Sequence, residues 1–246
     1  MKSWTKTEKV SFFVYLFWIS IGFVTMSLQW SESRIGDWEI FREDEHPWFR
    51  EFLGFCLRNG NPILMFLAAL NVYLMMIRHW GLSLARRWSL MVMLVSGVVE
   101  VFGTRTGYPF GVYYYTEAMG MMIFGVLPIS IPLAWLVVVS CALIGVKCYY
   151  PEWNKIRSGI AVGFIATGFD YVMEPFAARA MGYWLWQTPT GLPPWQNYLA
   201  WFGLSFFLVW RYASMRLEES CSDLRPPVIL GSMMLLFVVV RYVHGI

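Results

Sequence analysis

Residues 168–201 read GFDYVMEPFAARAMGYWLWQTPTGLPPWQNYLAW. The stretch begins inside an apolar segment, meets Pro175, passes through a loop rich in aromatic residues and proline, and re-enters an apolar segment near Asn197. Because proline disfavours helix at the residue before it, the first segment is expected to end at Glu174. The pattern predicts two membrane helices joined by an aromatic loop. Asp170 and Glu174 lie where ionisable groups are costly, so a functional role is the first hypothesis for them.

The composition of the whole chain agrees with a membrane protein. Of its 246 residues 58% are hydrophobic and 14% are charged, and the mean hydropathy is +0.51, whereas soluble domains carry about 25% charged residues. We therefore predict an all-α fold, a polytopic transmembrane helix bundle that forms one integral membrane domain over residues 1–246. The net charge of only +3 gives no reason to expect a nucleic-acid partner.

About seven membrane spans are predicted from the apolar segments. They lie at about 10–30, 61–77, 88–104, 121–146, 158–175, 197–213 and 226–243. The fourth is long, and Pro128 and Pro132 are expected to kink it. Residues 46–59, HPWFREFLGFCLRN, place several aromatic side chains on one helical face. This pattern predicts an interfacial amphipathic helix, which would be an eighth, half-inserted segment, and the alternative is an ordinary loop helix packed on the bundle.

The loop charges predict the orientation. Lys and Arg alternate between richer and poorer loops, apart from the long first loop, and the positive-inside rule then places the N-terminus in the cytoplasm. The first apolar segment is too long for a signal-peptide core, so it is expected to be a retained span. We expect a multi-pass protein of the bacterial cytoplasmic membrane, with lipid as its surroundings.

Three carboxylates fall within the predicted spans: Glu100, Asp170 and Glu174. The third and fifth spans run in the same direction, so all three should lie near one side of the membrane. Gly103 is expected to end the third span. An apolar environment and a helix C-terminus both disfavour ionised carboxylates. A protonated carboxylic acid beside a carboxylate suits general acid and base catalysis, so these three are the candidate catalytic residues.

An alternative role for the three carboxylates is structural. Arg105 and Arg179 are the basic residues of the two adjacent loops, and ion pairs with them would leave the acids without a catalytic task.

The candidate substrate-binding residues come from the loops beside these acids. The sequence FGTRTGYPFGVYYYTEAMG, residues 102–120, interleaves glycines with tyrosines. Aromatic faces near a proton donor could stabilise a developing carbocation, although an ordinary aromatic interface loop explains the pattern equally well. The candidates are Tyr108, Tyr113, Tyr115, Tyr183, Trp184, Trp186, Asn197 and Trp201.

Several enzyme classes lack their motifs in this chain. It has no DDxxD pattern, no histidine boxes and no flavin fingerprint, its three histidines are dispersed, and its cysteines form no CxxC pair. The last apolar segment has no lysine for retinal. We therefore expect neither a metal nor a cofactor, and acid–base chemistry on a lipid remains.

Four blocks of the sequence resemble the carotenoid biosynthesis membrane proteins of bacteria and archaea. They are EVFGTRTGYPFGVYYYTEAMG, GVLPISIPLAW, DYVMEPFAARAMGYWLWQ and GLPPWQNYLAW, in this order between residues 97 and 205. An Asp-Pro pair is usual in this family where the chain has Glu174-Pro175, and an aromatic residue and a glycine are common where Thr190 and Ala200 stand. The change to Glu174 keeps the acid but lengthens its reach, which leaves the substrate preference open.

The resemblance implies a membrane-embedded carotenoid hydratase of the γ-carotene 1'-hydratase or bisanhydrobacterioruberin hydratase type. Such a lyase (hydro-lyase) adds water across the terminal C1=C2 double bond of an acyclic (ψ) carotenoid end, as in lycopene or γ-carotene, and gives a tertiary alcohol. Other enzymes of carotenoid biosynthesis are further candidate partners. A lycopene-type cyclase using the same protonation, and a non-catalytic carotenoid- or lipid-binding membrane protein, are the alternatives.

Overall fold

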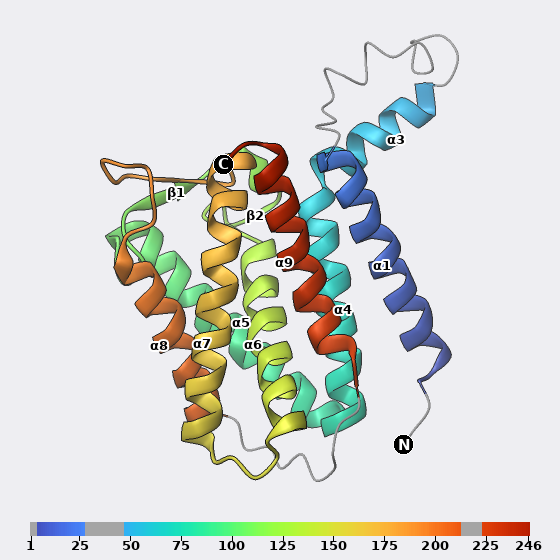
Figure 1. Ribbon diagram of the computed structural model, residues 1–246, viewed down its shortest axis with the longest axis vertical. Coiled ribbons are helices and arrows are strands. Elements are labelled where there is room, and N and C mark those ends of the chain that lie inside the picture. The colour runs from blue at the N-terminus through green and yellow to red at the C-terminus, as the bar shows by residue number, and fades with distance from the viewer. Residues whose placement is uncertain (1–3, 28–46, 213–222) are drawn as a thin grey trace.

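The computed structural model describes residues 4–27, 47–212 and 223–246, and its long helices lie side by side in one bundle (Figure 1). These helices are α1 (Lys6–Ser27), α4 (Gly60–Trp80), α5 (Leu82–Thr106), α6 (Ser130–Tyr149), α7 (Lys155–Glu174), α8 (Trp195–Tyr212) and α9 (Arg225–Val243). Within the described ranges, all but α8 are long and apolar enough to cross a membrane. The predicted all-α polytopic bundle is thus confirmed.

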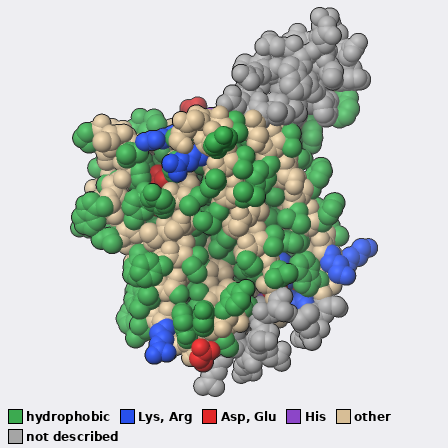
Figure 2. All heavy atoms as spheres, in the orientation of Figure 1, with side chains coloured by type: hydrophobic (Ala, Val, Ile, Leu, Met, Phe, Trp, Pro, Cys, Tyr) green, Lys and Arg blue, Asp and Glu red, His purple; other side chains and the backbone are tan. Residues whose placement is uncertain are grey.

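Helix α6 occupies the centre of the bundle. It packs against α4, α5, α7 and α9, while α1 lies on α4 and α9, and α8 lies along α7. Hydrophobic side chains cover much of the visible flank of the bundle, and the charged side chains in that view gather toward its two ends (Figure 2). This distribution suits a helix bundle surrounded by lipid.

The predicted interfacial segment is a helix, α3 (Pro47–Arg58). Trp48, Phe52 and Phe55 are among its exposed side chains, as expected for an amphipathic helix at a membrane surface. His46 lies outside the described residues.

The fourth span begins later than its apolar sequence predicts. Residues 121–129 are not helical: β2 (Met122–Ile123) pairs antiparallel with β3 (Leu127–Pro128), and α6 begins only at Ser130. Pro132 therefore lies in the first helical turn, where the missing N–H would have no intrahelical partner, and it does not kink the helix. The expectation of one long, kinked helix over 121–146 was wrong because an apolar segment does not distinguish strand from helix.

Helix α5 passes the glycine expected to stop it. It continues to Thr106, and Gly107 in the left-handed region (φ 74°) caps it by donating its N–H to the Gly103 carbonyl. Gly103 itself is packed closely against Phe110.

The α-helical part of α7 ends at Glu174, as Pro175 predicts, but the chain stays helical. Residues Pro175–Ala180 form a π-helical turn, η3, after which the Met181 N–H donates to the Phe176 carbonyl at 2.9 Å. Such π-helical turns accommodate interrupted hydrogen bonding and are frequent at functional sites. Here the wider turn follows directly on a candidate catalytic residue.

A group of charged residues joins α1, α4 and α9 at the end of the bundle where α1 begins. Glu8 is 4% exposed and forms ion pairs with Arg78 and Arg225, and Asp223 contacts His79 and Arg225. The expectation that only three acids lie within helical spans was incorrect, since α1 begins at Lys6 and includes Glu8. The pairing compensates for burying these charges.

Helices α7 and α8 approach each other through small residues. Gly159 and Gly163 are four residues apart on α7, and a Cβ at Gly163 would lie 2.8 Å from the Phe202 ring and 3.1 Å from the Phe202 carbonyl oxygen. Close approach at such glycine pairs is a common way for membrane helices to associate. It holds α8 close to the first half of α7, and the first turn of α8 then lies beside Asp170 near the other end of α7.

We expect Gly163→Ala to destabilise the protein by about 1–3 kcal/mol, because the added methyl group collides with α8 backbone. Gly168→Ala on the same helix is the matched control: nothing lies within 4 Å of its Cβ position, so it should be neutral or gain roughly 0.5–1 kcal/mol from reduced backbone freedom. Thermal unfolding in detergent measures both. Equal stability of the two variants would contradict the close packing.

Candidate active site

Three buried carboxyl groups line one small cavity near the end of the bundle opposite the Glu8 cluster. Glu100 comes from α5, and Asp170 and Glu174 come from α7. Their residues are 5%, 1% and 4% exposed, and the cavity between them has a volume of about 50 Å³. The structure therefore brings together the three candidate catalytic residues.

A two-stranded ribbon covers this cavity. Strand β1 (Tyr113–Tyr115) pairs antiparallel with β4 (Trp184–Trp186), with Tyr113 opposite Trp186 and Tyr115 opposite Trp184. Alternate residues of a strand point to the same face, so the ribbon presents two tyrosines and two tryptophans to the carboxyl groups.

Glu100 accepts three hydrogen bonds. The hydroxyls of Tyr113 and Tyr115 donate to its Oε2 at 2.6 and 2.9 Å, and the indole N–H of Trp135 on α6 donates to its Oε1 at 2.9 Å. Burial, followed by the nearby Glu100 charge, raises the pKa of both tyrosine hydroxyls above the ordinary value. They therefore remain protonated donors at neutral pH.

Glu174 accepts two hydrogen bonds from the other strand of the ribbon. The indole N–H groups of Trp184 and Trp186 donate to its Oε2 at 3.3 and 3.0 Å. Both donors lie ten or more residues further along the chain, and the turn after η3 brings them back over the carboxylate.

Asp170 has fewer donors than the two glutamates. The side-chain amide of Asn197, in the first turn of α8, donates to its Oδ2 at 2.7 Å. No other hydrogen bond to Asp170 is found within the described residues. Since hydrogen bonds stabilise the ionised form and burial disfavours it, Asp170 has the least compensation for a negative charge.

Aromatic rings form much of the rest of the cavity wall. Trp135 stacks on Trp201 with ring centres 3.9 Å apart and planes at 15°. The ring centre of Tyr113 lies 5.0 Å from that of Trp186 and 6.4 Å from that of Phe110. Ring faces of this kind attract a positive charge.

The structural role suggested for the acids, pairing with Arg105 and Arg179, is not found. Both arginines are exposed. Among the described residues, the ion pairs involve the Glu8 cluster, and none joins an arginine to Glu100, Asp170 or Glu174.

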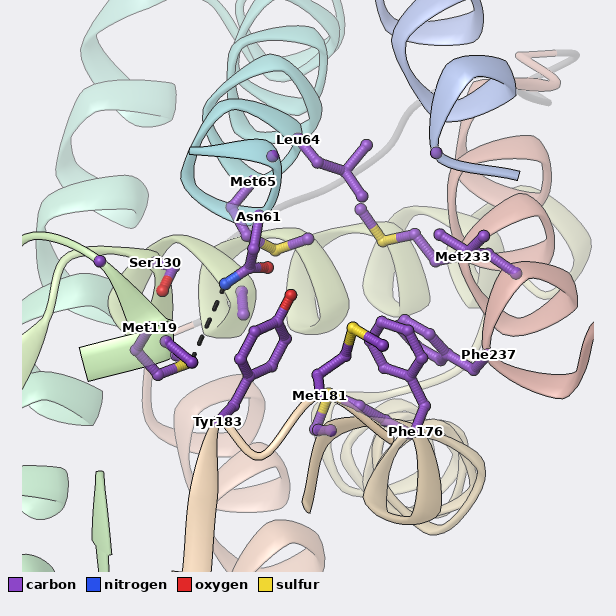
Figure 3. A pocket seen from close by; sticks show the side chains of 18 of the residues that line it. Asn61, Leu64, Met65, Met119, Ser130, Phe176, Met181, Tyr183, Met233 and Phe237 are labelled. Carbon is purple, nitrogen blue, oxygen red and sulfur yellow. Dashed lines mark hydrogen bonds between the residues drawn. The ribbon is translucent and has the colours of Figure 1, made fainter. Parts of the chain in front are cut away.

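A second, larger cavity adjoins the first. It has a volume of about 1050 Å³ and lies among α1, α4, α6, η3 and α9 (Figure 3). Four residues line both cavities: Ile131, Ala134, Met173 and Trp184. The small carboxylate cavity therefore borders a wide, mainly apolar one.

The candidate substrate-binding residues are distributed unevenly. Six of the eight line the small cavity, and Tyr183 lines the larger one. Tyr108 lines neither, and its residue is 71% exposed. The exposure of Tyr108 follows from its place just beyond the Gly107 cap of α5.

Sequence reasoning missed several residues that form these cavities. Trp135 lies in the apolar start of α6, where only its position four residues after Ile131 on one helical face could have suggested a shared cavity wall. Asn61, Met119 and Ser130 also line the larger cavity. Met119 and Ser130 lie in two of the blocks that carry the family resemblance, but their residue types suggested no role in the site. Within the described ranges, no group of three or more His, Cys, Asp or Glu side chains is arranged to hold a metal ion.

Comparison with known proteins identifies relatives of this chain. A family model described as carotenoid biosynthesis protein matches residues 60–245. The bisanhydrobacterioruberin hydratase of Haloarcula japonica is 31% identical over 112 residues, which cover 44% of this chain and 38% of that protein. The matched region is thus well under two thirds of the relative's length. No solved structure matches the chain.

We expect Tyr113→Phe to destabilise the protein by roughly 1–3 kcal/mol, because it removes the shortest hydrogen bond to buried Glu100. Tyr114→Phe is the control: Tyr114 lies next to it in β1 but its residue is 50% exposed, so its effect should stay within about 0.5 kcal/mol. Thermal unfolding in detergent compares them. A loss of the same size in both variants would argue against a specific contribution from the Glu100 contact.

Proposed function

The chain belongs to the carotenoid biosynthesis protein family, and we propose that it is a carotenoid hydratase. It would add water across the terminal C1=C2 double bond of an acyclic carotenoid end to give a tertiary alcohol. The observation that carries this proposal is the set of three carboxyl groups with unequal numbers of hydrogen-bond donors in a small aromatic cavity, which borders a large apolar one. The Haloarcula relative is named a hydratase, which supports the same reaction class.

The two cavities suit the two parts of such a substrate. The larger cavity is of the size that holds small-molecule ligands, and it would take the apolar polyene. The smaller cavity would take only the slender terminal isopropylidene group. The substrate end would enter past Met173 and Trp184, which line both cavities.

Asp170 is the proposed general acid. It has one hydrogen-bond donor, Asn197, and lies in the apolar interior, so the neutral acid form is the less costly one. Its proton would pass to C2, the C1=C2 π electrons would form the new C–H bond, and the positive charge would develop at C1. The rings of Trp135, Trp201 and Trp186 would face that cation.

Glu174 is the proposed base that positions the water. It shares a helix face with Asp170 at four residues' spacing. The water oxygen would bond to C1 while one water proton passes to Glu174, and transfer of that proton back to Asp170 would restore both groups. Glu100 is the alternative base, although its three donors favour a role in fixing the ribbon and balancing charge.

The membrane orientation is also proposed from the sequence. The described chain begins and ends at opposite ends of the bundle (Figure 1). With the N-terminus in the cytoplasm of a bacterial cell, the carboxylate cavity would lie toward the outer face of the cytoplasmic membrane.

Expression in a bacterium that accumulates lycopene tests the proposed function. The wild-type protein should convert the pigment to a product heavier by one water, whereas a ring product of unchanged mass would indicate a cyclase. Unchanged pigment with well-inserted protein would contradict an enzymatic role.

We expect Asp170→Asn to lower hydration by about 100-fold or more, since a general acid contributes roughly 10²–10⁴ in rate. Glu152→Gln is the control, because Glu152 is an exposed carboxylate that lines neither cavity, and it should retain activity. The measurement is product formation per amount of folded membrane protein. Near-normal turnover by Asp170→Asn would remove Asp170 from the acid role.

A further inference from the structure

Three polar side chains enter the wall of the larger, mainly apolar cavity close to its border with the carboxylate cavity. They are Asn61 at the start of α4, Ser130 at the start of α6, and Tyr183 just before β4. Figure 3 shows the Tyr183 hydroxyl directed toward Asn61 from the opposite wall. The mechanism described above uses none of them.

Ser130 has an unused hydrogen-bonding group. Its residue is 1% exposed, and its hydroxyl has no hydrogen-bond partner among the described residues. Leaving a buried hydroxyl without a hydrogen-bond partner is unfavourable, so a partner from outside the chain would stabilise it. Ser130 also adjoins Ile131 and precedes Ala134 by one helical turn, and both of these line the carboxylate cavity.

Tyr183 is held firmly with its hydroxyl in the cavity. Its backbone N–H donates to the Ala177 carbonyl at 2.9 Å, its carbonyl accepts from the Thr116 N–H at 3.0 Å, and its ring meets Phe176 edge to face. Burial raises the pKa of this hydroxyl above its ordinary value, so it stays protonated. Within the described chain no hydrogen bond to the hydroxyl is found, and the next residue, Trp184, donates to Glu174.

Asn61 completes the group. Its side-chain N–H₂ makes a long contact of 3.9 Å to the Met119 sulfur, and its carbonyl oxygen accepts no hydrogen bond from the described residues. An amide oxygen, a serine hydroxyl and a tyrosine hydroxyl together offer donors and acceptors, and a buried water typically needs two to four such partners.

We propose that Asn61, Ser130 and Tyr183 form the binding site for the water that is added to the carotenoid, and that they pass it across the border at Trp184 to the carboxylate cavity. The inference rests on the proposed hydratase function. A polyene that fills the larger, apolar cavity would otherwise exclude water, which is the second substrate. The polar site would retain a water molecule beside the polyene.

The proposal has a specific chemical consequence. Protonation at C2 needs only Asp170, so a variant with a poor water site should still form the cation. Without water, the cation returns to the alkene by losing a proton from C2 to a carboxylate. In D₂O the Asp170 carboxyl group carries deuterium and delivers a deuteron to C2. If the cation then loses the hydrogen originally bound to C2, the recovered substrate carries deuterium at C2.

The experiment incubates membranes containing the full-length protein with lycopene in D₂O and measures hydrated product and deuterium in recovered lycopene by mass spectrometry. Tyr183→Phe and Ser130→Ala should each lower hydration about tenfold, the size of one lost hydrogen bond, while raising the ratio of deuterated lycopene to product. Ser89→Ala is the matched control: Ser89 is buried and lines neither cavity, and its hydroxyl donates to the Ala85 carbonyl of its own helix, so the ratio should match wild type.

Two results would overturn the water site. One is an unchanged product rate in both variants. The other is a parallel fall of product and deuterium exchange, which would mean that the side chains hold the polyene or a hydroxyl on it rather than the water. Absence of both product and deuterium exchange with wild-type protein would instead refute the hydratase function, and the water site with it.

Discussion

A carboxyl group inside a membrane helix bundle must find its hydrogen-bond donors within the protein, because neither lipid nor bulk water supplies them. Much of the architecture at one end of this molecule meets that requirement. The β1–β4 ribbon turns two tyrosines toward Glu100 and two tryptophans toward Glu174, and α6 adds Trp135. The loops that connect the membrane helices thus fold back into the bundle to stabilise the charges there.

The three carboxyl groups have unequal numbers of hydrogen-bond donors, and the roles proposed for them follow this inequality. Glu100 accepts three hydrogen bonds and Glu174 two, whereas Asp170 depends on Asn197. A group with little compensation in an apolar setting keeps its proton at least cost, and a well-compensated neighbour can stay ionised. In the proposed mechanism, acid and base would therefore be distinguished by their hydrogen-bond partners rather than by residue type.

The bundle and the meeting of Glu100 with Asp170 and Glu174 could be predicted, because apolar segment length fixes the helices and their alternating direction fixes which ends lie together. The ribbon could not, since its short strands lie far apart in the chain and their pairing depends on how the helices between them are arranged. The hairpin at residues 121–129 was hidden because its apolar composition also suits a helix. Ser130 gave no signal, as an isolated serine in an apolar segment is unremarkable until its missing partner is seen.

The buried ion pairs of Glu8 with Arg78 and Arg225 have a mechanical consequence. They tie α1, α4 and α9 together at one end, while the large cavity separates the same three helices toward the other. The three helices are thus held together at the end with the ion pairs and spaced apart at the end with the cavity. Small tilts of the helices about the ion-paired end would widen the gaps between them on the side that faces the bilayer, so that a long apolar molecule could enter the cavity laterally from the lipid without crossing water.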